Sequence, residues 1–138
     1  MSLRIIFSVQ GCGRGHIAQA IALKKILADA GHEVVGVLVG TESPEDIPTY
    51  LTDRIAAPVV SFRSPQIDVS SGARSIAWVR TVSKAERGLG AWRKSLCRIL
   101  GAVDRFRPDL VVSFFEPLTV MTMRRVCTLH PGLARAQF

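Results

Sequence analysis

No apolar run in this 138-residue chain approaches the ~20 residues that a helix needs to cross a bilayer. The longest run near the start, residues 5–9, is short and follows a single charged residue, which argues against a signal peptide. Cysteine is also scarce, since Cys12, Cys97 and Cys127 are an odd number without metal-ligand spacing. These absences indicate a protein of the reducing cytoplasm, and we expect no metal or other cofactor.

Acidic residues are scarce in the second half of the chain. Residues 1–69 contain six Lys/Arg and seven Asp/Glu, a net charge of −1, whereas residues 70–138 contain twelve and four, a net charge of +8. Such an excess favours an anionic partner, although a solvated basic helix face is an alternative explanation. Segment 74–107 lacks interleaved aromatic residues, zinc-ligand spacing and an RNA-binding signature, so nucleic acid is the weakest candidate. We therefore expect a cytoplasmic protein, with an anionic membrane surface as one candidate partner.

What the chain does contain is a glycine-rich loop between an apolar strand and a helix. Gly11, Gly13 and Gly15 stand at alternate positions after residues 5–9 and before an Ala-rich segment. Glycines there permit a tight turn and a close approach to a ligand, and the helix N-terminus offers unpaired N–H groups. Arg14 adds a cation suited to phosphate. The pattern predicts a phosphate or diphosphate site, the alternative being a tight turn that binds nothing.

The spacing of this loop, G-x-G-x-G-H, differs from two common phosphate-binding motifs. It has His16 where the dinucleotide motif G-x-G-x-x-G has its last glycine, and it lacks the G-K-[ST] ending of a P-loop. The next apolar segment ends at Gly40-Thr41, with Glu42 only just beyond. A nucleotide- or dinucleotide-binding domain therefore remains an alternative function.

Apolar patterning along the chain alternates between strands and helices. The predicted strands are residues 3–9, 33–39, 57–62 and 110–115, and the predicted helices are residues 16–30, 49–55, 75–87, 89–106 and 118–127. A strand, a helix and a strand within about 40 residues form a parallel pair with a right-handed crossover. The fold class is α/β, a Rossmann-like parallel sheet with helices on both faces and the strand order 3-2-1-4. We expect one domain at 1–127 and an irregular tail at 128–138.

Two segments together resemble a known family. The first is residues 5–23, a strand, a glycine loop closing on Gly-His and an Ala-rich helix. The second is residues 107–117, RPDLVVSFFEP, similar to the "kPDlVisD.ep" strand and loop of that family. They resemble the N-terminal domain of GT-B glycosyltransferases, in the branch of the enzyme that adds N-acetylglucosamine to the lipid-linked peptidoglycan precursor. The resemblance covers roughly residues 3–120 and implies that further strands and a C-terminal domain would follow.

The resemblance implies the acceptor-side domain of an enzyme that transfers a sugar from a nucleotide-sugar donor to an acceptor hydroxyl. The branch that it resembles acts on a lipid-linked acceptor. It implies that the glycine loop lies near the acceptor's diphosphate or reacting hydroxyl, and that His16 is a catalytic base. Glu116, followed by Pro117 as in the family, is implied to orient the acceptor or assist His16, although Phe115 stands where an acidic residue is frequent. Thr119 is a further ligand-binding candidate. Because the family's C-terminal domain holds most of the donor, we expect this chain alone to be inactive.

The expected end of the sheet has a consequence for self-association. With no strand predicted after residue 127, the strand at 110–115 would expose a long apolar edge with unpaired N–H and C=O groups. Such an edge predicts a two-fold homodimer, unless residues 118–138 fold back over it. A non-catalytic fragment that serves as an interaction module is also open at this stage.

Overall fold

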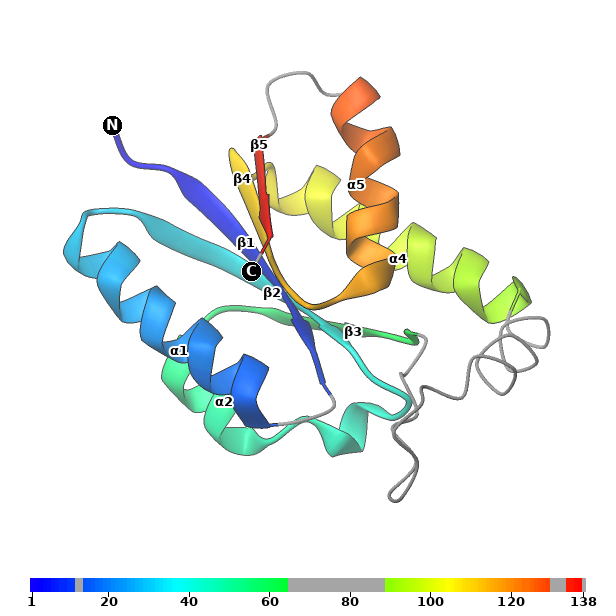
Figure 1. Cartoon of the computed structure of the whole chain (residues 1–138), viewed down its shortest axis with the longest axis horizontal. Helices are drawn as coiled ribbons and strands as arrows, with labels where there is room; N and C mark the ends of the chain where they lie inside the picture. The colour runs from blue at the N-terminus through cyan, green and yellow to red at the C-terminus, as the bar shows by residue number, and fades with distance from the viewer. Residues whose placement is uncertain (12–13, 65–88, 130–133, 138) are drawn as a thin grey trace, which may run out of the picture.

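The computed structural model describes residues 1–11, 14–64, 89–129 and 134–137. Within them strands alternate with helices, as expected of an α/β protein (Figure 1). The elements are β1 (Arg4–Gln10), α1 (Arg14–Asp29), β2 (Glu33–Gly40), the 3-10 helix η1 (Pro44–Asp46), α2 (Thr49–Ile55), β3 (Val59–Phe62), α4 (Leu89–Phe106), β4 (Leu110–Phe114), α5 (Pro117–Leu129) and β5 (Ala134–Gln137). The helix predicted at residues 75–87 lies outside the described residues.

The described strands form one parallel sheet in the order β3-β2-β1-β4-β5. The predicted order 3-2-1-4 is confirmed, and a fifth strand extends it. Val9 of β1 pairs with Val39 of β2 and with Phe114 of β4, so the carboxyl ends of these three strands lie level. Gly31 adopts the left-handed backbone (φ 81°) that ends α1 and returns the chain to β2.

The prediction of an irregular tail is wrong for residues 134–137. These residues form β5, which pairs with β4 from Leu110↔Ala134 to Ser113↔Gln137. Their sequence, ARAQ, lacks the β-branched and aromatic residues that mark a strand, and the free N–H and C=O groups of β4 supply the pairing instead. Because β5 occupies this edge, the reason for predicting a homodimer through β4 no longer holds.

Helices cover both faces of the sheet, so the side chains of each central strand are buried on both sides (Figure 1). Along β1, Phe7 packs in a cluster with residues of α1 and α2, whereas Ile6 packs in a cluster with residues of α4 and α5. This alternation follows from the two-residue period of a strand. It explains why residues 5–9 are almost uniformly apolar, the pattern typical of a buried parallel strand.

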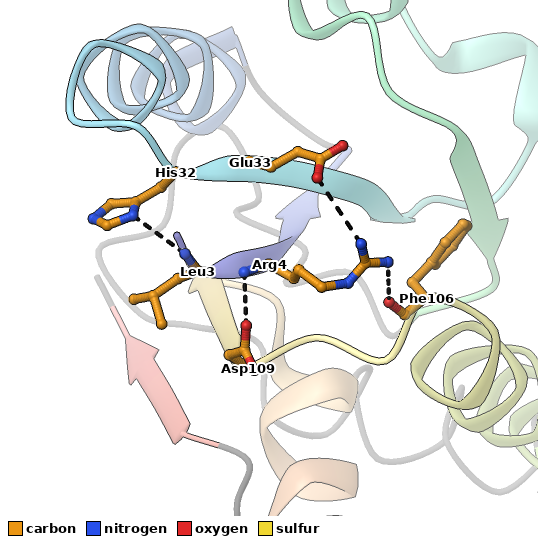
Figure 2. Close-up of polar contacts among 6 residues, drawn as sticks. All are labelled: Leu3, Arg4, His32, Glu33, Phe106 and Asp109. Atoms are coloured by element: carbon orange, nitrogen blue, oxygen red, sulfur yellow. Dashed lines mark hydrogen bonds and ion pairs between the residues drawn. The ribbon is translucent and has the colours of Figure 1, made fainter. Parts of the chain in front are cut away.

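Arg4 joins the amino ends of β1, β2 and β4 (Figure 2). Its backbone N–H donates to Asp109 Oδ2 at 2.8 Å, and the N–H of Asp109 donates to the Arg4 carbonyl at 2.8 Å. Its guanidinium donates to the Phe106 carbonyl at 2.8 Å and lies 3.9 Å from Glu33 Oε2. The positive charge of the guanidinium also interacts favourably with the negative C-terminal end of the α4 helix dipole. Asp109 belongs to the second of the two segments that resemble the known family, residues 107–117. It therefore joins β1 to β4 at the amino end of the sheet.

Two glycines outside the glycine loop allow a test of how closely α4 packs on the sheet. A Cβ added at Gly36 of β2 would lie 2.9 Å from the buried Phe106 ring, so we expect Gly36→Ala to lower the free energy of unfolding by about 1–3 kcal/mol. Gly101 of α4 is the matched control, since an added Cβ meets nothing within 4 Å. Gly101→Ala should raise the free energy of unfolding by about 0.5–1 kcal/mol through helix propensity. Urea denaturation measures both, and equal effects of the two substitutions would contradict the packing described.

Candidate functional site

The candidate site lies where the chain leaves β1 and β4, which are neighbours at the centre of the sheet. From β1 the chain passes to α1 on one face, and from β4 it passes to α5 on the opposite face (Figure 1). Open α/β sheets bind ligands outside the carboxyl ends of strands at such a switch point. The structure thus brings Gly11 and residues 14–16 to the same edge of the sheet as residues 115–119, about a hundred positions away in sequence.

Gly11 has a packing reason to be glycine. Its N–H donates to the Gly40 carbonyl at 2.8 Å, and an added Cβ would lie 2.9 Å from that same oxygen. The Cβ would also approach Thr41 Cβ to 3.1 Å. The close contact between the ends of β1 and β2 therefore explains this glycine without a ligand.

Gly15 has no such reason within the described chain. Helix α1 begins at Arg14, two residues earlier than predicted, so Gly15 and His16 lie in its first turn. A Cβ added at Gly15 would meet no atom within 4 Å, and the Arg14 side chain is exposed. The space beside the first turn of α1 is open at this point. Gly13, predicted to bind the ligand, lies outside the described residues.

His16 stacks on Phe115. The two ring centroids are 5.5 Å apart and the ring planes differ by 7°, an offset parallel arrangement. Phe115 follows the last residue of β4, has a positive φ of 56° and keeps 51% of its surface exposed. Left-handed backbone costs a non-glycine residue about 1–2 kcal/mol. This contact physically links the glycine-loop segment to the β4–α5 connection.

Glu116 lies in the interior of the domain, with none of its surface exposed. It precedes Pro117, the first residue of α5, and acts as the N-cap of that helix. One carboxylate oxygen, Oε2, accepts the N–H of Thr119 at 2.6 Å. The other, Oε1, accepts the N–H of Leu118 at 3.3 Å and the hydroxyl of Ser64. The carboxylate thus satisfies the start of α5 and ties it to the segment after β3.

The position of Glu116 depends on Gly40 at the end of β2. A Cβ added at Gly40 would lie 2.9 Å from Glu116 Oε1 and 2.8 Å from Ser64 Cβ. The described contacts of Glu116 are therefore with other parts of the domain. The sequence predicted that Glu116 assists His16, but among the described residues no hydrogen bond joins the two. The residue that contacts His16 is Phe115, the neighbour of Glu116 in the chain.

Thr119 is also fully buried, whereas the sequence pattern predicted a ligand-binding residue. Its hydroxyl accepts a hydrogen bond from Ser8 Oγ of β1 at 2.8 Å. This bond joins α5 to the central strand β1, three residues before Gly11. Thr119 therefore helps to hold α5 against β1, and its side chain is not accessible to a ligand in this structure.

Three polar residues of this region were missed by the sequence analysis. Ser8 and Gln10 interrupt the apolar face of β1 at alternate positions, and Ser64 follows β3. The interruption at residues 8 and 10 is a signal that was present in the sequence. Within the described part of the chain, Gln10 Oε1 is buried and has no hydrogen-bond partner. Nor do the described His, Cys, Asp and Glu side chains gather in any group of three suited to a metal ion.

Comparison with known families adds to this geometry. The model of the family described as Glycosyl transferase family 1 matches residues 3–129, which include both segments of the site. The chain belongs to this glycosyltransferase family. The match confirms the resemblance inferred from the two sequence segments. A search of curated proteins returned no match.

Solved structures of glycosyltransferases share the fold of this family member. MurG of Acinetobacter baumannii aligns with a TM-score of 0.61 and 17% identity over 98% of this chain and 34% of its own. SsfS6 of Streptomyces sp. SF2575 aligns with a TM-score of 0.55 and 20% identity over 98% of this chain and 38% of its own. The calicheamicin glycosyltransferase CalG4 gives 0.55 and 18% over 99% and 32%. The chain thus has the GT-B type of fold and spans about a third of the length of these structures.

The burial of Glu116 predicts a large loss of stability on its removal. Glu116→Ala should lower the free energy of unfolding by about 2–3 kcal/mol, because the Ser64 hydroxyl and two N–H groups of α5 lose their acceptor. Glu116→Gln retains one acceptor oxygen and should cost less, about 1 kcal/mol. Exposed Glu45 is the control, and its replacement by Ala should change stability by at most about 0.5 kcal/mol. Chemical denaturation followed by circular dichroism distinguishes these outcomes, and an unaffected Glu116→Ala variant would contradict the described cap.

Proposed function

We propose that this chain is the acceptor-side domain of a glycosyltransferase, which transfers a sugar from a nucleotide-sugar donor to an acceptor hydroxyl. The observation that carries the proposal is the meeting of His16 and the first turn of α1 with the β4–α5 connection, in a member of a glycosyltransferase family. Open space beside Gly15 and the N–H groups of the helix start suit an anionic ligand. Exposed Arg14 adds a positive charge there.

In the proposed reaction His16 is the general base. The acceptor oxygen forms a bond to the anomeric carbon of the donor sugar while the bond from that carbon to the diphosphate oxygen breaks. The imidazole takes the hydroxyl proton, and the nucleotide diphosphate leaves with the bonding electron pair. Gly13, Arg14 and Gly15 hold the acceptor's phosphate or diphosphate close to the imidazole, while Gly11, whose N–H is bonded to Gly40, allows the close contact between the ends of β1 and β2. Glu116 and Thr119 keep α5 in place beside them.

The two substrates follow from the proposal at the level of chemical class. The donor is a nucleotide sugar, and the acceptor carries a hydroxyl, with a lipid-linked acceptor as the version implied by the sequence resemblance. A lipid-linked acceptor would bring this domain to an anionic membrane surface, for which the basic second half of the chain is suited. None of the described helices has the length and apolar character of a membrane span.

A nucleotide- or dinucleotide-binding domain is the second candidate function. The strand order and the position of the glycine loop are common to both functions. Binding measurements separate them, because a nucleotide site recognises the base and ribose in addition to the phosphates, whereas the proposed acceptor site recognises the phosphates.

The proposal predicts that the glycine loop binds a diphosphate. We expect inorganic pyrophosphate to bind the 138-residue chain and Gly15→Val to weaken this binding about tenfold or more, because the new side chain fills the open space. Gly101→Val is the matched control, since Gly101 also has open space around it but lies on α4. Isothermal titration calorimetry measures the affinities, and thermal unfolding confirms that both variants fold.

Two results of this titration would contradict the proposed function. One is equal affinity for pyrophosphate in the wild-type chain and in Gly15→Val. The other is a much tighter binding of UDP or NAD than of pyrophosphate that Gly15→Val abolishes, which would favour the nucleotide-binding alternative.

The proposal also predicts that the 138-residue chain does not transfer sugar by itself. It spans about a third of the length of the glycosyltransferases it aligns with, and we place donor binding in the remainder. An assay that offers UDP- and GDP-sugars together with lipid-linked and small acceptors should show no transfer above background. Sustained transfer that is lost in His16→Ala would show that the chain holds its donor unaided.

A further inference from the structure

We propose that Phe115 is a positioning residue, which sets the plane of the His16 imidazole and thereby aims its nitrogens at the ligand. The proposal rests on the proposed function for the role of His16, but the contact itself is a property of the described structure. The two rings are stacked with centroids 5.5 Å apart and planes within 7° of each other.

The backbone of Phe115 is the first line of support. Three non-glycine residues among those described have positive φ, namely Ala56, Arg107 and Phe115. Ala56 and Arg107 directly follow α2 and α4, where left-handed residues commonly end a helix. Phe115 follows a strand and precedes a helix, so no helix ending explains it. Strained backbone at such a position is characteristic of functional sites.

The residues on either side of Phe115 hold this backbone in place. Phe114 is buried and packs edge-to-face on Phe7, with ring centroids 5.2 Å apart. Glu116 is buried as the cap of α5, and its own N–H donates to Ser113 Oγ at 3.3 Å. With both neighbours fixed, the position of residue 115 is determined by the core of the domain.

The side chain of Phe115 is the second line of support. Half of its surface is exposed, at 51%, although apolar positions of β4 next to it are filled and buried. Core packing therefore does not account for an aromatic residue here. Its ring instead meets His16, which lies in the first turn of a helix from the opposite face of the sheet.

Parallel stacking has a chemical consequence for His16. The N–H and the lone pair of an imidazole lie in the plane of the ring, so stacking on a flat aromatic face leaves both nitrogens free to form hydrogen bonds. The contact with the Phe115 ring restricts rotation about the side-chain torsions of His16. A base held in this way has less rotational freedom to lose when an acceptor hydroxyl binds.

The experiment compares Phe115→Leu, which removes the ring, with Phe115→Tyr, which keeps it. Met121→Leu is the control, since Met121 is exposed on α5 and has no part in the stack. Proton–carbon NMR of the full 138-residue chain reports the carbon-bound protons of His16, assigned with His16→Ala. We expect an upfield ring-current shift in the wild type, in Phe115→Tyr and in Met121→Leu, and its loss in Phe115→Leu. The same His16 shift in Phe115→Leu as in the wild type would overturn the proposal.

A double-mutant cycle then tests the positioning role, with inorganic pyrophosphate as the probe. Phe115→Leu should weaken pyrophosphate binding about fivefold when His16 is present and change it less than about twofold in the His16→Ala background. Phe115→Tyr should restore the wild-type affinity. Independent, additive effects of the two substitutions would overturn the proposal, because Phe115 would then act without His16.

Failure of the proposed function is distinguishable from failure of this inference. If the wild-type chain does not bind pyrophosphate, the anion site is refuted, and the positioning role is decided by the reaction of His16 with diethyl pyrocarbonate. Mass spectrometry follows this reaction at each histidine, and His32 at the amino end of the sheet is the internal reference. Phe115→Leu should change the rate at His16 by about fivefold and leave the rate at His32 unchanged. An unchanged rate at His16 would overturn the proposal.

Discussion

The buried carboxylate of Glu116 is the interaction on which the carboxyl edge of this sheet depends. A carboxylate without solvent must have its oxygens satisfied by nearby donors, and here the donors come from two places. The N–H groups of Leu118 and Thr119 belong to the start of α5, and the Ser64 hydroxyl belongs to the segment after β3. The carboxylate reaches Ser64 because Gly40 has no side chain in between. A single group therefore fixes the start of α5 relative to β2 and β3.

This constraint also determines the surroundings of His16. Because Glu116 and Phe114 are both anchored inside the domain, Phe115 between them is held in a left-handed backbone with its ring outside. The ring then lies against the imidazole of His16. A second buried bond, from Ser8 of β1 to Thr119, joins the same helix to the central strand. Buried polar contacts on the α4/α5 side of the sheet therefore determine where the Phe115 ring lies against His16.

The two ends of the sheet have different roles. At the amino end, Arg4, Asp109 and the end of α4 hold the central strands together through short hydrogen bonds. At the carboxyl end, the open space beside Gly15 and the half-exposed Phe115 leave room for a ligand. This division agrees with the general behaviour of open parallel sheets, in which ligands bind at the carboxyl ends of the strands. The match to the glycosyltransferase family model covers residues 3–129 and therefore includes residues at both ends of the sheet.

Much of the fold was determined by the sequence alone. The almost uniformly apolar residues 5–9, the helical stripe behind the glycine loop and the next apolar segment predicted a parallel pair of strands with a right-handed crossover, and the predicted order 3-2-1-4 agrees with the structure. Tertiary structure alone decided β5, whose residues carry no strand pattern and pair because β4 offers free backbone groups. It also decided the roles of Glu116 and Thr119. Sequence spacing places these residues at the correct edge, but whether a side chain points to solvent or into the domain depends on donors contributed by distant segments. The stack of Phe115 on His16 joins residues 99 positions apart, and no local pattern encodes such a contact.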